Sequence, residues 1–172
     1  MNFRSIACLT GAAALLSACM ITKEAELVSG VETWTPNTWD CLVSQDEVAK
    51  KATWDEPTTV TEIIQDNIYQ SGLLSFKVGK PYVIKFTNND QVVRFLRAPI
   101  FFSKSSILKV VHEGEDIKPS CLQAIGVAPK QTTEIHLVPL ETGYYDYHDT
   151  FLTAPILTEI STNGSIGLAY VY

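Results

Sequence analysis

The stretch Tyr82-Val83-Ile84-Lys85-Phe86-Thr87 decides the fold class of this chain, because large apolar residues alternate in it with residues of the opposite face. Successive side chains of a β-strand point to opposite faces of a sheet, so Tyr82, Ile84 and Phe86 are predicted to face the core together. A second stretch, Glu134-Ile135-His136-Leu137, repeats the alternation and predicts that His136 points to solvent. The pattern is typical of strands with one buried face.

Short β-rich runs of this kind recur from Thr58 onward. Turn residues such as Gly79, Asn88-Asn89 and Asn163-Gly164 separate them, and no long stretch shows a period of 3.6 residues. The sequence therefore predicts an all-β sandwich or barrel over residues 58–172. The predicted strands are 58–65, 73–78, 81–88, 92–97, 106–111, 122–128, 132–139, 143–149 and 165–171.

A polar segment, residues 19–57, precedes these strands and is predicted to be a tether and an arm that wraps the domain. Within it, Ser44-Gln45-Asp46-Glu47 fits a capping box and predicts a short helix near residues 45–51. The arm holds all three tryptophans: Trp34, Trp39 and Trp54. They are interpreted as apolar plugs that hold the arm against the sandwich, with a stacking platform for a ligand as the alternative.

The first residues of the chain have the pattern of an export signal. Arg4 precedes an apolar run from Ile6 to Leu16, which closes on Ser17-Ala18-Cys19. This segment resembles a bacterial lipoprotein signal, which implies that residues 1–18 are removed and that Cys19 carries a lipid. Because Met20 rather than Asp follows Cys19, the resemblance favours the periplasmic side of the outer membrane.

Charge and cysteine content agree with export. The net charge is −6, and no run of Lys or Arg suits a phosphate backbone, so nucleic acid is not an expected partner. Beyond the signal and the lipid site, two cysteines remain. An even pair in an oxidising compartment usually closes a disulfide, so a Cys41 to Cys121 bond is predicted, with a thiol metal site as the alternative.

Several motifs in the predicted strands resemble one family. The motifs run in order as Val78-Gly79-Lys80-Pro81-Tyr82, Phe86-Thr87-Asn88, Arg97-Ala98-Pro99-Ile100-Phe101-Phe102, Val138-Pro139-Leu140 and Gly143-Tyr144-Tyr145. Together they resemble the cupredoxin-like domains of periplasmic copper proteins over residues 58–172. The resemblance implies a Greek-key β-sandwich, in agreement with the predicted strands.

The copper ligands of that family are absent from the matching positions. The resemblance places the first family histidine at Arg94, the cysteine at Asp149 and the second histidine near Ala154, and no methionine follows Met20. A blue-copper site needs imidazole and thiolate donors. The resemblance therefore implies a former metal pocket without a blue-copper site, and no cofactor is expected.

Strand parity suggests what replaces the metal. Arg94 shares a face with Leu96, and Asp149 shares a face with Tyr145 and Tyr147. If these faces are inner, as in the family, Arg94 and Asp149 form an ion pair in the old pocket, since an unpaired buried charge is costly. The alternative is that both side chains lie on a solvated rim, where such pairs contribute little.

A different copper site is a second possibility, because the chain contains His112, His136 and His148. His148 and Asp146 are two residues apart on one predicted outward face and would make at most a weak metal site, because a tight site needs three or four ligands. Ordinary surface polarity is the alternative explanation.

The usual catalytic patterns are missing from the sequence: there is no G-x-S-x-G elbow, no H-E-x-x-H and no glycine-rich phosphate loop. The chain is therefore predicted not to be an enzyme. The apolar loop 149–162 is expected to seal the former metal end or to dock an envelope protein. The resulting interpretation is a lipid-anchored periplasmic binding or assembly module, with a copper-binding or copper-delivery protein that uses non-standard ligands as the alternative.

Overall fold

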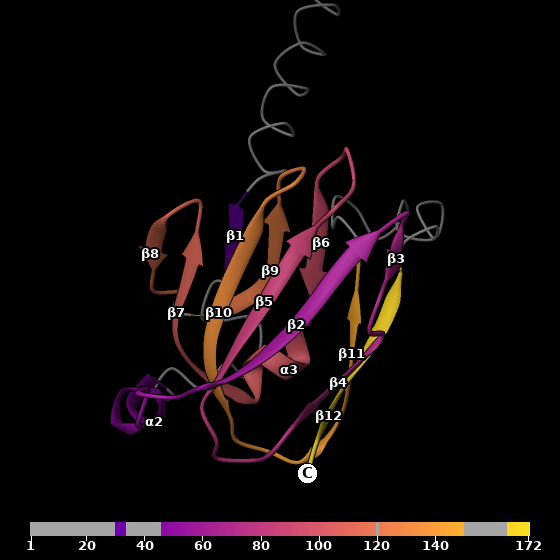
Figure 1. Cartoon of the computed structure of the whole chain (residues 1–172). Coiled ribbons are helices and arrows are strands. Elements are labelled where there is room, and N and C mark those ends of the chain that lie inside the picture. Colours follow the sequence, from indigo (N-terminus) through magenta and orange to yellow (C-terminus); the bar gives the residue numbers. More distant parts are fainter. Residues whose placement is uncertain (1–29, 34–45, 120, 150–164) are drawn as a thin grey trace, which may run out of the picture.

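Two six-stranded β-sheets stacked face to face form the structure, a computed structural model (Figure 1). It describes residues 30–33, 46–119, 121–149 and 165–172. The predicted β-sandwich is confirmed. The elements are β1 (Gly30–Thr33), α2 (Asp46–Lys51), β2 (Thr58–Gln65), β3 (Ile68–Tyr69), β4 (Leu73–Phe76), β5 (Tyr82–Asn88), β6 (Arg94–Arg97), α3 (Pro99–Ser103), β7 (Ser105–His112), β8 (Glu115–Ile117), β9 (Leu122–Val127), β10 (Thr132–Pro139), β11 (Gly143–His148) and β12 (Ile166–Val171).

The first sheet, called here the β5 sheet, has the order β3-β2-β5-β10-β7-β8. Strand β5 pairs parallel with β2 and antiparallel with β10, which sets Ile84 opposite Ile135. Tyr82, Ile84 and Phe86 are all buried in the core, as their alternation predicts. Burying such side chains contributes about 2 kcal/mol each, so this strand is a main source of stability.

The second sheet, called the β11 sheet, has the order β1-β9-β6-β11-β12-β4. Strand β12 lies between β11, with which it is antiparallel, and β4, with which it is parallel. Strand β1 comes from the segment predicted to be an arm, and it pairs with β9 at the other edge. The arm thus contributes a strand to the sandwich.

Most predicted strands are present with bounds close to those expected, and the helix predicted near 45–51 is α2. Four short elements were not predicted: β1, β3, β8 and the helix α3. Helix α3 begins at Pro99, whose ring suits the first turn of a helix, and buries Phe101 and Phe102. These elements are too short for periodicity to reveal them.

The neighbouring strands β11 and β12 pack tightly on the core side of their sheet. Gly167 lies directly opposite Tyr147 in the antiparallel pair. A Cβ atom at Gly167 would lie 2.1 Å from Cζ of Tyr147, so the ring occupies the space that a side chain would need. Glycine at this position lets the Tyr147 ring lie flat against the strand.

Helix α2 lies against the outer face of the β5 sheet, beside β7 and β10. The Ala49 amide donates to Oγ of Ser106 at 2.9 Å, and Nε1 of Trp54 donates to the Ala49 carbonyl at 2.8 Å. The Trp54 ring lies 5.6 Å from the His136 ring. Trp54 therefore packs against the sandwich, as the plug interpretation predicts, while Trp34 and Trp39 lie outside the described residues.

The prediction that His136 points to solvent is wrong in part. His136 lies on the outer face of β10, but its side chain is 17 % exposed because Trp54 covers it. A strand's outer face becomes buried when another segment of the chain packs on it, and the alternation of a strand does not reveal this.

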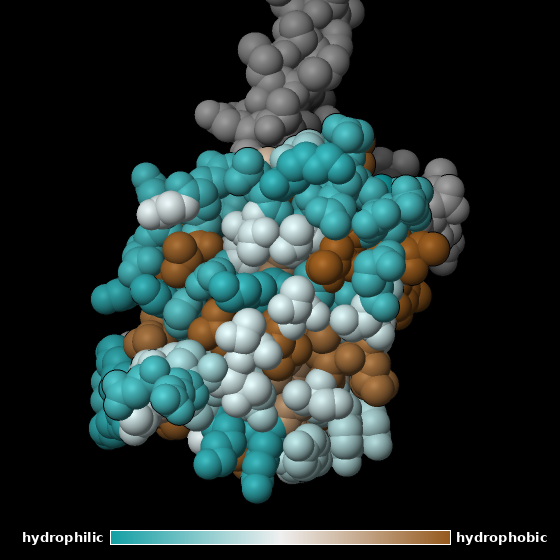
Figure 2. Space-filling view, viewed as in Figure 1, coloured by the Kyte–Doolittle hydropathy of each residue, from teal (hydrophilic) through white to brown (hydrophobic). Residues whose placement is uncertain are grey.

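The face of the molecule in Figure 2 is mostly polar, with apolar groups scattered between the polar ones. Some of these apolar groups lie on the side where Figure 1 places β3, β4 and β12. Ile68 of β3 and Leu73 of β4 are 59 % and 54 % exposed. Among the described residues, none of the helices has the length and apolar character needed to span a bilayer.

Candidate functional site

The candidate site is an ion pair between Arg94, the first residue of β6, and Asp149, the residue after β11. Nη1 of Arg94 lies 2.9 Å from Oδ2 of Asp149, and the two side chains are 15 % and 3 % exposed. The other carboxylate oxygen, Oδ1, accepts the Phe95 amide at 2.8 Å. The structure thus brings together the two residues that the resemblance assigned to a former metal pocket, and it buries the carboxylate.

A second carboxylate, Asp90, completes this group. Nε of Arg94 donates to Oδ2 of Asp90 at 2.8 Å, so the guanidinium is held between two acids. Asp90 also accepts the amides of Asp66 and Asn67 at 2.6 and 3.1 Å. These two residues form the β2–β3 turn, both with positive φ, which Asp and Asn tolerate better than most residues. The end of β2, the β5–β6 connection and the end of β11 therefore converge on one cation.

The pKa values of Asp149 and Asp90 are shifted in opposite directions. Burial is the largest influence on Asp149 and raises its pKa, although the Phe95 amide and Arg94 act to lower it. Burial also acts to raise the pKa of Asp90, but the amides of Asn67 and Asp66 and the Arg94 guanidinium outweigh it, and the pKa is lowered. The site therefore contains one cation between two acids, and the three groups satisfy one another's charges.

Beneath the ion pair lies a buried polar layer that sequence reasoning missed. The Tyr147 hydroxyl donates to the Glu62 carboxylate, and Glu62 is fully buried. Oε1 of Glu62 accepts the Ser71 amide at 2.9 Å and the Ile63 amide at 3.1 Å. Glu62 shares the inward parity of Val60 and Ile64 in β2, and this parity is the signal that would have found it.

Tyr69 links this layer to the ion pair. Its hydroxyl donates to the Phe95 carbonyl at 2.6 Å, and its ring lies 4.8 Å from that of Tyr147 in an edge arrangement. Burial, followed by the nearby Asp149 charge, raises the pKa of Tyr69 well above its ordinary value. Burial raises the pKa of Tyr147 most, and the hydrogen bond to Glu62 adds to the rise. Both phenols therefore remain protonated hydrogen-bond donors.

The three histidines lie at separate places in the fold. His112 is buried, with Nδ1 2.8 Å from Oγ1 of Thr133. His136 lies under Trp54, and His148 contacts the Asp146 carboxylate on the outer face of β11. The hydrogen bond from His148 is the main reason that the pKa of Asp146 is lowered. In the described part of the chain, no three side chains of His, Cys, Asp or Glu come close enough to share a metal ion.

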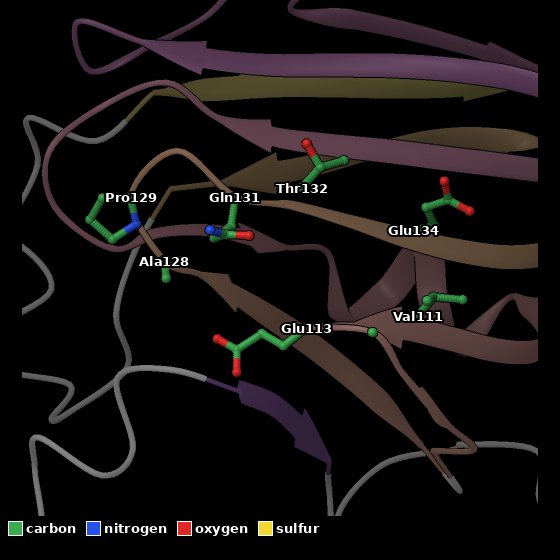
Figure 3. A pocket seen from close by; sticks show the side chains of 8 residues that line it. Val111, Glu113, Ala128, Pro129, Gln131, Thr132 and Glu134 are labelled. Atoms are coloured by element: carbon green, nitrogen blue, oxygen red, sulfur yellow. The ribbon is translucent and has the colours of Figure 1, made fainter.

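An open hollow of about 570 Å³ lies between the β7–β8 turn and the β9–β10 connection. Figure 3 shows that Glu113 extends toward the connection that carries Ala128 and Pro129. The other carboxylate in its lining, Glu134, is already held by Lys85 at 2.8 Å. Few convergent polar groups remain to bind a ligand, so the hollow is a weaker candidate than the ion pair.

Several predicted site residues lie outside the described residues. These are the lipidation site Cys19, the disulfide partner Cys41 and all of the predicted loop 149–162 except Asp149. Cys121 is 6 % exposed, directly before β9. The Cys41 to Cys121 disulfide stays a prediction.

Comparison with known proteins yields only structural likenesses. No protein-family model matches the chain, and no curated protein matches its sequence. An oxidised variant of amicyanin shares 15 % identity over 70 % of this chain and 89 % of its own, with a TM-score of 0.41.

Two oxidase structures show likeness of the same order. The multicopper oxidase of Campylobacter jejuni shares 13 % identity over 70 % of this chain and 31 % of its own, with a TM-score of 0.44. The multicopper oxidase McoA of Aquifex aeolicus shares 12 % identity over 70 % of this chain and 30 % of its own, with a TM-score of 0.47. This chain spans about a third of each oxidase chain, and the likeness is one of strand arrangement.

Proposed function

We propose that this protein is a lipid-anchored periplasmic module that binds or assembles other envelope components, and that its cupredoxin-like sandwich has exchanged a copper site for an ion pair. The contact between Arg94 and Asp149 is the observation that carries the proposal. The sequence resemblance places a copper-binding imidazole and thiolate of the family at these two positions. A guanidinium there repels a metal cation and offers it no lone pair.

The chemistry of the surrounding residues supports the same view. The acids next to Arg94 are Asp90 and Asp149, and hard carboxylates are poor substitutes for the soft donors that copper favours. Residues 150–164, which follow Asp149 directly, contain no His, Cys or Met. The residues around Arg94 do not fit a blue-copper ion, so the proposed function does not involve copper chemistry at this site.

Titration of the purified, processed chain with Cu(I) and with Cu(II) tests this part of the proposal. We expect no stoichiometric uptake of either ion against a competing chelator. The variant His148→Ala and its matched control His136→Ala should behave like the parent protein. Tight uptake of one ion per chain would overturn the proposal, whichever residues hold it.

A copper-handling role is the second candidate, and one contact favours it. The His148 imidazole and the Asp146 carboxylate contact each other on the outer face of β11, where both could bind the same metal ion. If copper binds there, His148→Ala abolishes uptake while His136→Ala preserves it. This result would support delivery of copper from a surface site instead of storage in the sandwich.

The anchor is tested separately. Mass spectrometry of the processed protein should find an acylated N-terminal Cys19, and Cys19→Ala should prevent release of residues 1–18. Membrane fractionation then tests the expected outer-membrane location. A soluble chain that starts at another residue would contradict the anchor and leave the question of copper untouched.

A further inference from the structure

The outer face of β11, β12 and β4 carries an exposed apolar and aromatic patch. Alternate residues of these strands, including Tyr145, Tyr147 and Ala169, lie in the core, so their neighbours face away from it. The patch, called here the tyrosine face, consists of Leu73 (54 % exposed), Tyr144 (70 %), Ile166 (68 %), Tyr172 (55 %) and the partly covered Leu168 and Tyr170.

The tyrosines of this face are held in a row. Tyr144 and Tyr170 are opposite each other across β11 and β12, with ring centroids 4.7 Å apart and planes 14° apart. Tyr172 continues the row at 5.6 Å. Because neighbouring rings restrain one another, little side-chain entropy is lost when the row is covered. The row of rings is therefore pre-organised for contact with an extended surface.

The chemistry of the face suits the boundary between a membrane and water. Tyrosine combines an apolar ring with a hydroxyl that can stay hydrated, and for this reason it gathers at the level of lipid headgroups. Asp146 and His148 also lie on this face, and their side chains contact each other. A contiguous exposed apolar patch of this kind marks a binding surface.

We propose that the tyrosine face rests on the surface of the lipid bilayer, an inference that depends on the proposed lipid at Cys19. The length of chain between the lipid and the fold supports this occupant. Residues 20–29 separate Cys19 from β1, and β1 belongs to the same sheet as β11, β12 and β4. Ten extended residues reach about 33 Å.

That reach exceeds the distance across the sheet. Four strand spacings separate β1 from β12, which is about 19 Å. The lipid can therefore enter the bilayer while the tyrosine face of the same sheet rests on it. Helix α2 covers the other sheet and then faces away from the membrane.

Hydroxyl-radical footprinting of the processed protein tests the inference. The protein is placed in vesicles of phosphatidylethanolamine with a minor fraction of phosphatidylglycerol, and flotation shows whether it is bound. Val48 on α2 and Ile100 on α3, 44 % and 49 % exposed, serve as internal references. Tyr144, Ile166 and Tyr172 are more exposed than the two reference residues. Relative to these references, we expect them to be labelled severalfold less than their exposed fractions alone would predict.

A matched pair of variants sharpens the test. Tyr144→Ser with Tyr172→Ser removes the rings without disturbing the core, and we expect labelling of Ile166 and Leu73 to rise. The control Val48→Ser should leave the protection of the tyrosine face unchanged.

The outcomes separate the inference from the proposed function. Flotation with protection of the face supports both. If the protein floats with the vesicles but the tyrosine face is labelled in proportion to its exposed fraction, the inference is wrong and the anchor stands. If the protein does not float, both the inference and the anchor are wrong. Protection that grows with the density of protein on the vesicle overturns the inference in favour of a second copy on the face.

Discussion

The Tyr147 hydroxyl donates a hydrogen bond to the buried Glu62 carboxylate, so that β11 in one sheet and β2 in the other are joined through the core. The Ser71 and Ile63 amides satisfy the second oxygen of the same carboxylate. The bond therefore couples the stability of the sandwich to a single phenol.

Tyr147→Phe should lower the free energy of unfolding by about 1–3 kcal/mol, because the buried carboxylate loses its phenol donor and water cannot replace it. Urea unfolding followed by fluorescence measures the change. The control is Tyr144→Phe, whose hydroxyl is exposed and which should change stability little. Equal stability of the two variants would contradict a structural role for the Tyr147 to Glu62 bond.

Gly167→Ala should destabilise the fold by about 1–3 kcal/mol, because the added Cβ overlaps the Tyr147 ring. The overlap predicts coupling between the two positions. In the double variant with Tyr147→Leu, the cost of Gly167→Ala should be smaller than in the parent, and a double-mutant cycle of unfolding free energies measures the difference. If the unfolding free energies of the two substitutions are additive, the cost of Gly167→Ala does not come from overlap with the Tyr147 ring.

Arg94→Ala should cost about 3 kcal/mol, since removal of the cation leaves Asp149 buried without its charged partner. The matched control is Lys104→Ala, which breaks a half-exposed pair with Glu141 and should cost less than about 1 kcal/mol. Chemical denaturation of both variants checks the contrast. Similar small losses would mean that the Arg94 cluster contributes no more than a surface pair.

The pH dependence of stability should contain a contribution from His136. Burial under Trp54, followed by the charge of Lys109, lowers the pKa of His136 below 6.5, while Glu134 and Asp116 act in the other direction. As pH falls, His136 is therefore protonated in the unfolded chain at a higher pH than in the folded protein. The contribution of neutral His136 to stability is fully present above the unfolded pKa and is lost as pH falls through the folded pKa.

His136→Gln should accordingly flatten the loss of stability between about pH 7 and pH 5. Urea unfolding at several pH values measures the slope for both proteins. The control is His148→Gln, on the exposed face of β11. If the slope is unchanged in His136→Gln and reduced in His148→Gln, the pH dependence comes from His148 and the prediction is wrong.

Trp54→Ala should release helix α2, because Trp54 holds the Ala49 carbonyl and covers His136. We expect faster proteolysis within residues 46–54 and a loss of about 2 kcal/mol, less than for a fully buried tryptophan. Ser106→Ala, which removes the acceptor of the Ala49 amide, should act in the same direction. Unchanged proteolysis in both variants would show that the helix is held by other contacts.

The sequence predicted the strands well because their signal is local. The alternation at Tyr82, Ile84 and Phe86 and the turn residues between runs are written in neighbouring residues, and the structure follows them. The parallel pairing of β12 with β4 was not predicted, because the partner of a strand depends on contacts nearly a hundred residues apart. The burial of His136 was missed for the same reason.

The site was predictable in part. Parity and resemblance pointed to Arg94 and Asp149, but Asp90 was missed although it precedes Arg94 by four residues. Glu62 was overlooked because a charged side chain in a strand is usually assigned to the outer face. Its burial becomes understandable once its donors are known, and two of them, the Tyr147 hydroxyl and the Ser71 amide, are distant from it in sequence.

The position of β12 has a consequence for how the chain folds. Strand β4 joins its sheet through β12, which comes almost a hundred residues later, so the sheet cannot close before residues 166–171 are available. Pairings at such long range make folding slow and leave nascent chains open. Until residues 166–171 are made, β4 and β11 each lack the partner that β12 supplies, so the incomplete sheet exposes unpaired strand edges to other chains.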